Sequence, residues 1–272
     1  MSTIDFEFLN SFLDSLLPEY RVEAWNLLSN DVSCLDGCIA PSHYFGTLMA
    51  ERLSLEPEAI KYHPNGITTE GVFPAKELPL PPSVGYLARL CPLKGLDILV
   101  DAFIGLKESG KHEHLHLKIA GGMTDEDVPF VEEQKSKLLR AGLNDCFSIT
   151  PNISREEKFS FLKSLSIFSV PARYPEAFGL YVVEALLAGS PVVLPNTGAF
   201  PEIVESTRGG KLYDPSASGA FTETLDELLN DPQTTRSMGL KAHQAVLNTY
   251  SNEKLAKRLV DEVVSPLPVK QK

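Results

Sequence analysis

Short apolar segments alternate with longer segments of helical periodicity between residues 82 and 214. Each apolar segment carries few polar residues, which is typical of a strand that helices bury on both faces. The expected strands are 84–88, 115–120, 146–150, 167–170, 191–195 and 211–214. Strands that alternate with helices favour an α/β fold, so the pattern predicts a doubly wound parallel sheet of the Rossmann-like type.

The segments around this region are also expected to be ordered elements. A helix over 5–29 is interrupted by Pro18, two short strands at 38–41 and 60–63 flank a helix over 42–53, and a proline-rich linker spans 68–83. Within the region, helices are expected at 94–109 and 125–141, and Ser154 and Glu157 form a capping box that begins another. Three helices, at 217–230, 233–247 and 252–264, follow it.

Charge and composition restrict the class of partner. The chain has 272 residues, a formal net charge of −11 and a pI near 5.1, which argues against nucleic acid. No apolar run approaches the ~20 residues of a membrane-spanning helix, and the first residues lack the basic start of a signal peptide. The four cysteines match no common zinc spacing. We therefore expect a cytoplasmic protein with buried free thiols, no transmembrane segment and no nucleic-acid partner.

Ligands of doubly wound sheets bind beyond the carboxyl ends of the strands. The first such loop carries Arg89 and Lys94 just before a helix begins, and two cations at a helix N-terminus favour an anion. The alternative is that both are solvated surface cations. The second loop has Gly121 and Gly122, which permit close approach of the backbone to a ligand but are a weak signal.

Two carboxylates lie in the apolar stretch 174–195. Glu176 falls in a loop after the expected strand 167–170, and Glu184 lies about one turn inside a helix that runs from Leu180 to Gly189. Eight residues of helix span at most ~12 Å, so both carboxylates are expected to face one cleft at different depths. A buried carboxylate also needs a hydroxyl donor or a cation to offset its desolvation. The alternative is that Glu184 points to water and Glu176 is an ordinary acid at a helix start.

These motifs occur together in one known family. The segments "GYLARLCPLKGLDILVDAF", "LKIAGG", "ISREEKFSFLKSLSIFSVPARYPEAFGLYVVEALLAGSPVVLPNTGAFPEIVE" and "GGKLYDP" resemble the nucleotide-binding half of a family-four retaining glycosyltransferase with the two-domain GT-B architecture. The resemblance covers about residues 32–262, and its Glu-x7-Glu motif falls on Glu176 and Glu184. It implies transfer of a sugar from a nucleotide-diphosphate sugar, with no metal and no other cofactor.

The resemblance also implies a role for each residue at the strand ends. Arg89 and Lys94 would neutralise the donor diphosphate, and Glu176 would contact the transferred sugar; these three are the candidate catalytic residues. Glu184 would accept hydrogen bonds from the ribose hydroxyls.

The other expected contacts are made by the backbone. The amides of Phe178, Gly179 and Leu180 would reach the sugar and the distal phosphate. Ile153 would meet the base through its main chain, and Gly121 would let the backbone approach the ligand. The histidines of "HEHLH" at 112–116 are expected to lie at a solvated edge, with a metal cluster as the alternative.

The N-terminal part departs from the family pattern. Residues 1–75 resemble only a remnant of the acceptor domain with its linker, 76–248 the donor-binding domain, and 249–272 the helix that packs back toward the N-terminal part. The acceptor half is therefore expected to be missing. Three interpretations remain: a glycosyltransferase completed by a partner or a longer chain, an inactive nucleotide-sugar-binding module, or a doubly wound domain with another ligand. Self-association through the uncovered apolar surface, with poor packing over residues 1–80, is also expected.

Overall fold

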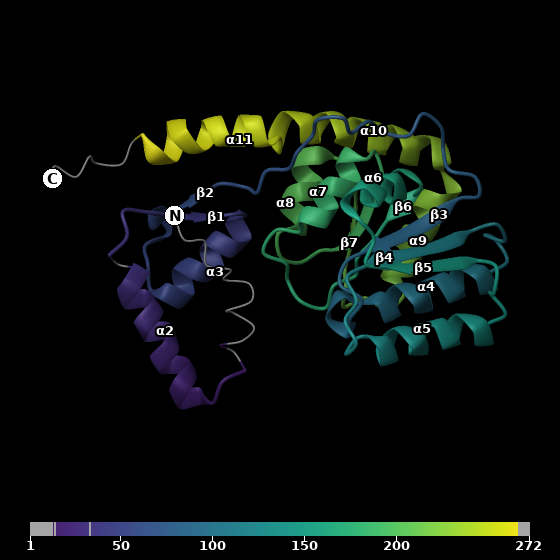
Figure 1. Ribbon diagram of the computed structural model, residues 1–272, viewed down its shortest axis with the longest axis horizontal. Coiled ribbons are helices and arrows are strands. Elements are labelled where there is room, and N and C mark those ends of the chain that lie inside the picture. The colour runs from purple at the N-terminus through teal and green to yellow at the C-terminus, as the bar shows by residue number, and fades with distance from the viewer. Residues whose placement is uncertain (1–12, 14, 33, 266–272) are drawn as a thin grey trace.

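The computed structural model describes residue 13 and residues 15–32 and 34–265. A six-stranded sheet dominates the larger part of the chain (Figure 1). Its strands are β3 (Ser83–Leu87), β4 (His116–Gly121), β5 (Phe147–Pro151), β6 (Ile167–Phe168), β7 (Val192–Pro195) and β8 (Gly210–Tyr213). All neighbouring strands pair in parallel. The predicted doubly wound parallel sheet is confirmed.

The strand order, β5-β4-β3-β6-β7-β8, reverses direction between β3 and β6. The chain builds outward from β3 to β5, crosses back to β6 and builds the other way to β8. Such a reversal is a topological switch point, where the loops after two adjacent strands diverge and leave room for a ligand. The loops after β3 and β6 therefore mark the place where a site is expected.

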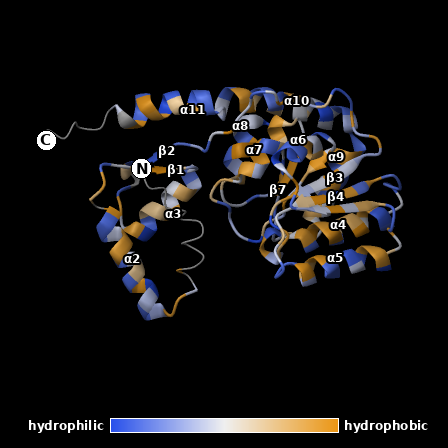
Figure 2. Cartoon of the chain, viewed as in Figure 1, coloured by the Kyte–Doolittle hydropathy of each residue, from blue (hydrophilic) through white to orange (hydrophobic). Residues whose placement is uncertain are grey.

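Helices cover both faces of the sheet, as Figure 1 shows. On one face lie α4 (Leu96–Glu108), α5 (Val128–Arg140) and α9 (Ala220–Asn230), which contact one another through α4. On the other lie α6 (Arg155–Lys163), α7 (Leu180–Leu187), α8 (Phe200–Thr207) and α10 (Pro232–Thr249). Because both faces are covered, β3, β6 and β7 are buried at every residue. The covering helices α4 and α5 carry both hydrophobic and hydrophilic residues, as Figure 2 shows.

A smaller unit, which we call the N-terminal lobe, comprises the described residues from 15 to 62. It contains α2 (Pro18–Val32), β1 (Cys38–Ala40), α3 (His43–Leu53), a short 3-10 helix (Pro57–Ala59) and β2 (Ile60–Tyr62). β1 and β2 form a separate two-stranded parallel sheet. Val32, Ala40, Phe45, Met49 and Leu53 make its own apolar cluster, to which the larger part contributes Ala177.

The lobe is joined to the larger part by polar contacts as well. The Ser42 hydroxyl donates to the Ala177 carbonyl at 2.7 Å. The Glu202 carboxylate of α8 accepts from the backbone amides of His43 and Tyr44, at 2.9 and 2.7 Å. These amides begin α3 and have no acceptor within the helix, so Glu202 satisfies them from a distant part of the chain, beside the N-cap residue Ser42.

The C-terminal helices return across the lobe. α10 lies over α7 and α8, and α11 (Asn252–Arg258) continues past the larger part and ends in a π-helical turn, Leu259–Val264 (Figure 1). His63 bonds to the Leu255 carbonyl at 2.9 Å, and the Lys61 ammonium donates to the Glu262 carbonyl at 3.0 Å.

Most predicted elements are confirmed, with ends shifted by a few residues. The helix expected over 5–29 lies partly outside the described residues, and within them α2 begins at Pro18, where an interruption was predicted. The predicted capping box of Ser154 and Glu157 is present. Helix α8 was not predicted, because it has only eight residues and follows a Gly- and Pro-containing stretch; Pro201 is compatible with a helix start.

Two minor expectations need correction. All four cysteines are free, but none is buried, and Cys34 is exposed. The histidines at 112–116 do not all lie at a solvated edge, because the His112 side chain is 10% exposed and bonds to Asp226 of α9 at 2.6 Å. No group of three or more potential metal ligands lies together among the residues that the structure describes. Among those same residues, no helix combines the length and apolar character needed to cross a bilayer.

Candidate active site at the switch point

The loops after β3 and β6 touch at the switch point. Gly95 ends a 3-10 turn (Pro92–Lys94) that follows β3, with φ of 73°. A Cβ atom at this position would lie 1.9 Å from the carbonyl oxygen of Pro171, in the loop after β6. Only glycine fits both the left-handed backbone and this approach. The close contact brings Lys94, the residue before Gly95, beside the loop that carries Glu176.

Lys94 and Glu176 form the central ion pair of the site. The Lys94 ammonium lies 2.5 Å from Glu176 Oε1, and the two side chains are only 18% and 3% exposed. Tyr181 donates its hydroxyl to the same Oε1 at 2.7 Å, and Lys94 also bonds to the Tyr174 hydroxyl. The prediction that a cation or a hydroxyl donor compensates each carboxylate is confirmed for Glu176. Burial and the charge of Glu176 raise the pKa of Tyr181 well above its usual range, so its hydroxyl stays protonated.

The Lys94 ammonium also lies near two aromatic faces. It is 4.7 Å from the ring centroid of Tyr174 and 5.5 Å from that of Tyr181. Aromatic faces attract cations, so the rings stabilise a charge that burial would otherwise penalise. Lys94 is therefore not a solvated surface cation, which was the alternative interpretation for this residue.

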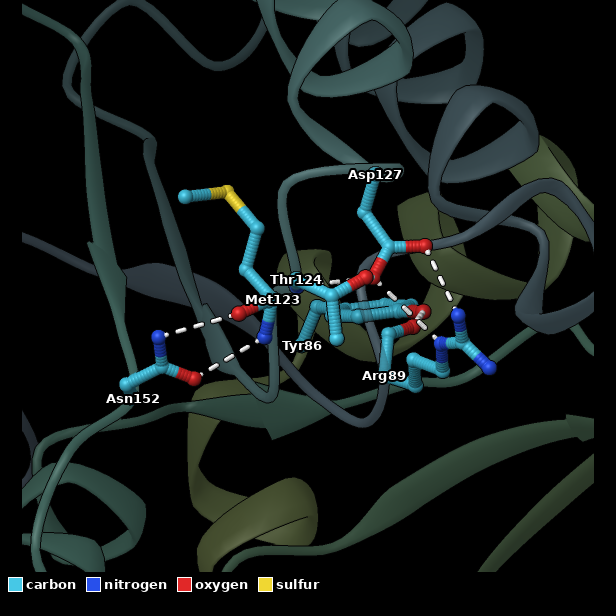
Figure 3. A network of polar contacts seen from close by, with 6 residues as sticks. All are labelled: Tyr86, Arg89, Met123, Thr124, Asp127 and Asn152. Atoms are coloured by element: carbon cyan, nitrogen blue, oxygen red, sulfur yellow. Dashed lines mark hydrogen bonds and ion pairs between the residues drawn. The ribbon is translucent and has the colours of Figure 1, made fainter.

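Arg89 is held by a carboxylate that the sequence analysis did not single out. Its guanidinium contacts Asp127 through Nε and Nη2, at 3.4 and 3.3 Å (Figure 3). The Thr124 amide and hydroxyl donate to Asp127 Oδ2 at 2.9 and 2.8 Å. These bonds, with the contact from Arg89, lower the pKa of Asp127. Arg89 itself is 54% exposed, whereas Asp127 is 6% exposed, so a buried anion orients a cation that faces solvent.

The loops after β3, β4 and β5 are bonded to one another. The Leu90 amide donates to the Gly122 carbonyl at 2.8 Å, and the Asn152 amide to the Gly121 carbonyl at 2.7 Å. The Asn152 side chain both accepts from the Met123 amide, at 2.9 Å, and donates to the Met123 carbonyl, at 3.1 Å (Figure 3).

Gly121 and Ile153 occupy fixed positions in these loops. Gly121 has φ of 144°, and a Cβ atom there would lie 1.7 Å from the Ala88 carbonyl oxygen. A larger residue at position 121 would therefore clash with the adjacent loop of the protein, which carries Ala88. Ile153 is partly buried and packs against the main core.

Glu184 is paired with a lysine of the neighbouring helix. The Lys158 ammonium of α6 lies 2.5 Å from Glu184 Oε1, and both side chains are partly buried. Because Glu184 lies on α7 one turn beyond its start, the pair bridges two helices on the same face of the sheet. The prediction of a compensating cation is confirmed here too.

Phe178, Gly179 and Leu180 form the entry to α7. Gly179 adopts φ of 93° as the residue before the helix. Phe178 is buried against Tyr250, with ring centroids 5.9 Å apart, and Leu180 is 45% exposed. The first amides of a helix have no acceptor within it, so this turn presents donors next to Glu176.

Several site residues were missed from the sequence. Tyr181 lies in an apolar helix and looks like a core residue. Asp127, Lys158 and Asn152 lie 26 to 38 residues along the chain from Arg89, Glu184 and Met123, to which they bond. The position of Asn152 in a strand-end loop is the one available signal, because asparagine tolerates the left-handed backbone that it adopts there.

Solved structures share this fold. Sucrose-phosphate synthase from Thermosynechococcus elongatus superposes with a TM-score of 0.75 and 22% identity, over 89% of this chain and 60% of the synthase. Anabaena HepE, crystallised with UDP and glucose, superposes with a TM-score of 0.75 and 20% identity, over 92% of this chain and 68% of HepE. The GT-B type of fold is confirmed by these likenesses.

Sequence comparison gives the family. D-inositol 3-phosphate glycosyltransferase from Corynebacterium efficiens is 29% identical over 165 residues, which cover 61% of this chain and 38% of that protein. The chain thus matches well under half the length of this relative. The family model described as glycosyl transferases group 1 matches residues 74–245, more than half of the 272 residues. The chain therefore belongs to the group 1 glycosyl transferases.

Proposed function

We propose that the switch-point loops bind a nucleotide-diphosphate sugar, and that the protein transfers its hexosyl group to an acceptor with retention of configuration and without a metal ion. Membership of the group 1 glycosyl transferases supports this, as do relatives that are named glycosyltransferases. One of these relatives, from Mycobacterium tuberculosis, is named as GDP-mannose-dependent, so relatives and structural neighbours offer both GDP and UDP as candidate nucleotides.

The Lys94–Glu176 pair is the observation that carries the proposal. It places a cation and a carboxylate, each protected from water, side by side at the point where two loops diverge. A cation suits a phosphate, and a carboxylate suits sugar hydroxyls, so the pair matches the junction between the two halves of a nucleotide sugar. Arg89, five residues earlier in the same loop, supplies a second cation for the diphosphate.

The proposed reaction needs charge stabilisation at the leaving group. The bond from the sugar C1 to the phosphate oxygen breaks, the acceptor oxygen bonds to C1 on the same face, and the departing phosphate takes the acceptor's proton. Arg89 and Lys94 would stabilise the negative charge that develops on that phosphate, which is usually the largest catalytic term in such a site.

The remaining roles follow the loops. Glu176 would hold the sugar, and the turn from Phe178 to Leu180 would donate to the sugar and the distal phosphate. Glu184 would accept from the ribose hydroxyls. Ile153 would meet the base through its main chain, and Gly121 would let the backbone approach the ligand.

Calorimetric titration tests donor binding. The chain is titrated with UDP, GDP and ADP and with their common sugar conjugates, beside Arg89→Ala and the double variant Arg89→Ala/Lys94→Ala. We expect one nucleotide to bind, about tenfold more weakly to Arg89→Ala and not measurably to the double variant, because each charge-assisted bond contributes about 1.5–3 kcal/mol. Lys135→Ala removes an exposed lysine of α5 that pairs with Glu132 and is the matched control. A folded chain that binds none of these ligands would contradict the proposal.

An inactive nucleotide-sugar-binding module is the second candidate function. The N-terminal lobe contributes only a two-stranded sheet and two described α-helices, which supports the proposal that residues 1–75 are a remnant of the acceptor domain, beside 76–248 for the donor and 249–272 for the returning helix. Release of free nucleotide from a bound conjugate, with and without added acceptors, separates the two. Transfer favours the enzyme, and tight binding without release favours the module.

The N-terminal lobe exposes large apolar side chains that support association, either with a second copy or with a polypeptide that supplies the acceptor half. They are Leu17, Tyr20, Val22, Leu27, Leu35 and Ile39. A single monomeric species by light scattering, with strong hydrogen-exchange protection of the lobe, would oppose this part of the proposal.

We place the protein in the cytoplasm, where its four free thiols would remain reduced.

A further inference from the structure

Tyr181 bonds to the carboxylate that is proposed to hold the sugar. It is the second residue of α7, and its hydroxyl donates to Glu176 Oε1 at 2.7 Å. Its ring contacts those of Phe168 and Phe200, with centroids 6.2 and 6.4 Å away. These two contacts and the start of the helix restrict the position of the hydroxyl.

The two donors to Glu176 converge on one oxygen. Lys94 and Tyr181 both bond to Oε1, and within the part of the chain that the structure describes no hydrogen bond or ion pair ends at Oε2. A carboxylate of which one oxygen is saturated in this way has its second oxygen available to accept from a ligand.

Lys94 alone would not fix the plane of the carboxylate. Its ammonium is a point charge with three equivalent donors on a flexible stem, and the terminal torsion of glutamate is broad. A second donor from a different direction restricts that torsion. This restriction of the torsion affects only a ligand that donates a directional hydrogen bond to Oε2, such as a sugar hydroxyl.

We propose that Tyr181 is a positioning residue for the donor sugar: with Lys94 it holds Oε1 of Glu176 so that Oε2 is aimed at a sugar hydroxyl. This inference rests on the proposed function, because it takes Glu176 as the contact to the sugar. It predicts that the Tyr181 hydroxyl contributes to recognition of the sugar and not of the nucleotide.

The test compares a nucleotide with its sugar conjugate. Dissociation constants are measured by calorimetry for UDP and UDP-glucose, and for GDP and GDP-mannose, with the unmodified chain and with Tyr181→Phe. We expect the affinity for the nucleoside diphosphate to stay within twofold, and the extra affinity conferred by the sugar to fall about tenfold, since a hydrogen bond to a charged group is lost. A purely structural role would weaken both ligands together.

Tyr174→Phe is the matched control. It removes a hydroxyl that bonds to Lys94 in the same cluster, so both ligands should change in parallel and their ratio should stay constant. If Tyr181→Phe does not fold by circular dichroism, Tyr181→Met serves instead, since a flexible methionine fills the space of the ring. An unchanged ratio in the Tyr181 variant would overturn the inference. If the unmodified chain bound none of the four ligands, the proposed function itself would fail.

Discussion

Removing the ammonium of Lys94 should expose how strongly the site depends on its central ion pair. Lys94→Met keeps an unbranched stem without the ammonium and leaves Glu176, whose side chain is 3% exposed, without its cation. Removing one partner of a buried pair costs about 3–5 kcal/mol. The remaining bond from Tyr181 offsets about 1 kcal/mol, so we expect a loss of about 3 kcal/mol in the free energy of unfolding.

The reverse variant should be milder. Glu176→Gln leaves an ammonium that is 18% exposed and still contacts the ring and hydroxyl of Tyr174, so we expect a loss of about 2 kcal/mol. The double variant leaves no unpaired charge. It should therefore cost about 3 kcal/mol rather than the sum of about 5, a coupling of about 2 kcal/mol.

Urea unfolding followed by far-ultraviolet circular dichroism measures all four free energies. The exposed pair of Lys135 and Glu132 provides the control cycle, with an expected coupling below about 0.5 kcal/mol. Additive losses at Lys94 and Glu176, or a loss below about 1 kcal/mol for Lys94→Met, would refute the reasoning that this pair is shielded from water.

Two further predictions concern the loops around the pair. Gly95→Ala should destabilise the protein by about 3 kcal/mol, and Gly110→Ala by about 1 kcal/mol. Both glycines have φ of 73°, but of these two only Gly95 has a neighbour, the Pro171 carbonyl, that an added Cβ atom would meet. Equal losses in urea unfolding would contradict the steric argument. Asp127 has a lowered pKa, chiefly through the Thr124 amide, so its contribution is present at neutral pH and is lost as the pH falls below about 4. Asp127→Asn should therefore lose less stability than the unmodified chain between pH 7 and pH 3, and an identical loss would contradict this assignment.

The layered fold could be predicted because its signal is local. Strands such as 84–88 and 191–195 are recognisable as apolar runs. The helix start at Ser154 is recognisable from a capping box that spans only four residues, Ser154 to Glu157. Burial on both faces of a sheet requires each strand to be apolar along its own length. Each strand can therefore be predicted without knowing which strands lie beside it. The rule that ligands bind at strand ends then places Lys94 and Glu176 near the site.

The partners of those residues could not be predicted, because each depends on elements that meet only after folding. The strand order puts β3 beside β6, and this adjacency brings Lys94 to Glu176 across 82 residues of chain. Tyr181 contacts the rings of Phe168 and Phe200 and bonds to that carboxylate only once these elements are folded together.

The sequence by itself determined which chemical groups stand at the strand ends, since periodicity and turn residues act over a few positions. Only the tertiary structure decided which of these groups are paired, shielded or exposed. Asp127 shows the difference: in the sequence it is one acid of "TDED", and in the fold it is the buried anion that orients Arg89. Electrostatic interactions depend on distance and burial in space, and neither quantity is encoded in the spacing of residues along the chain.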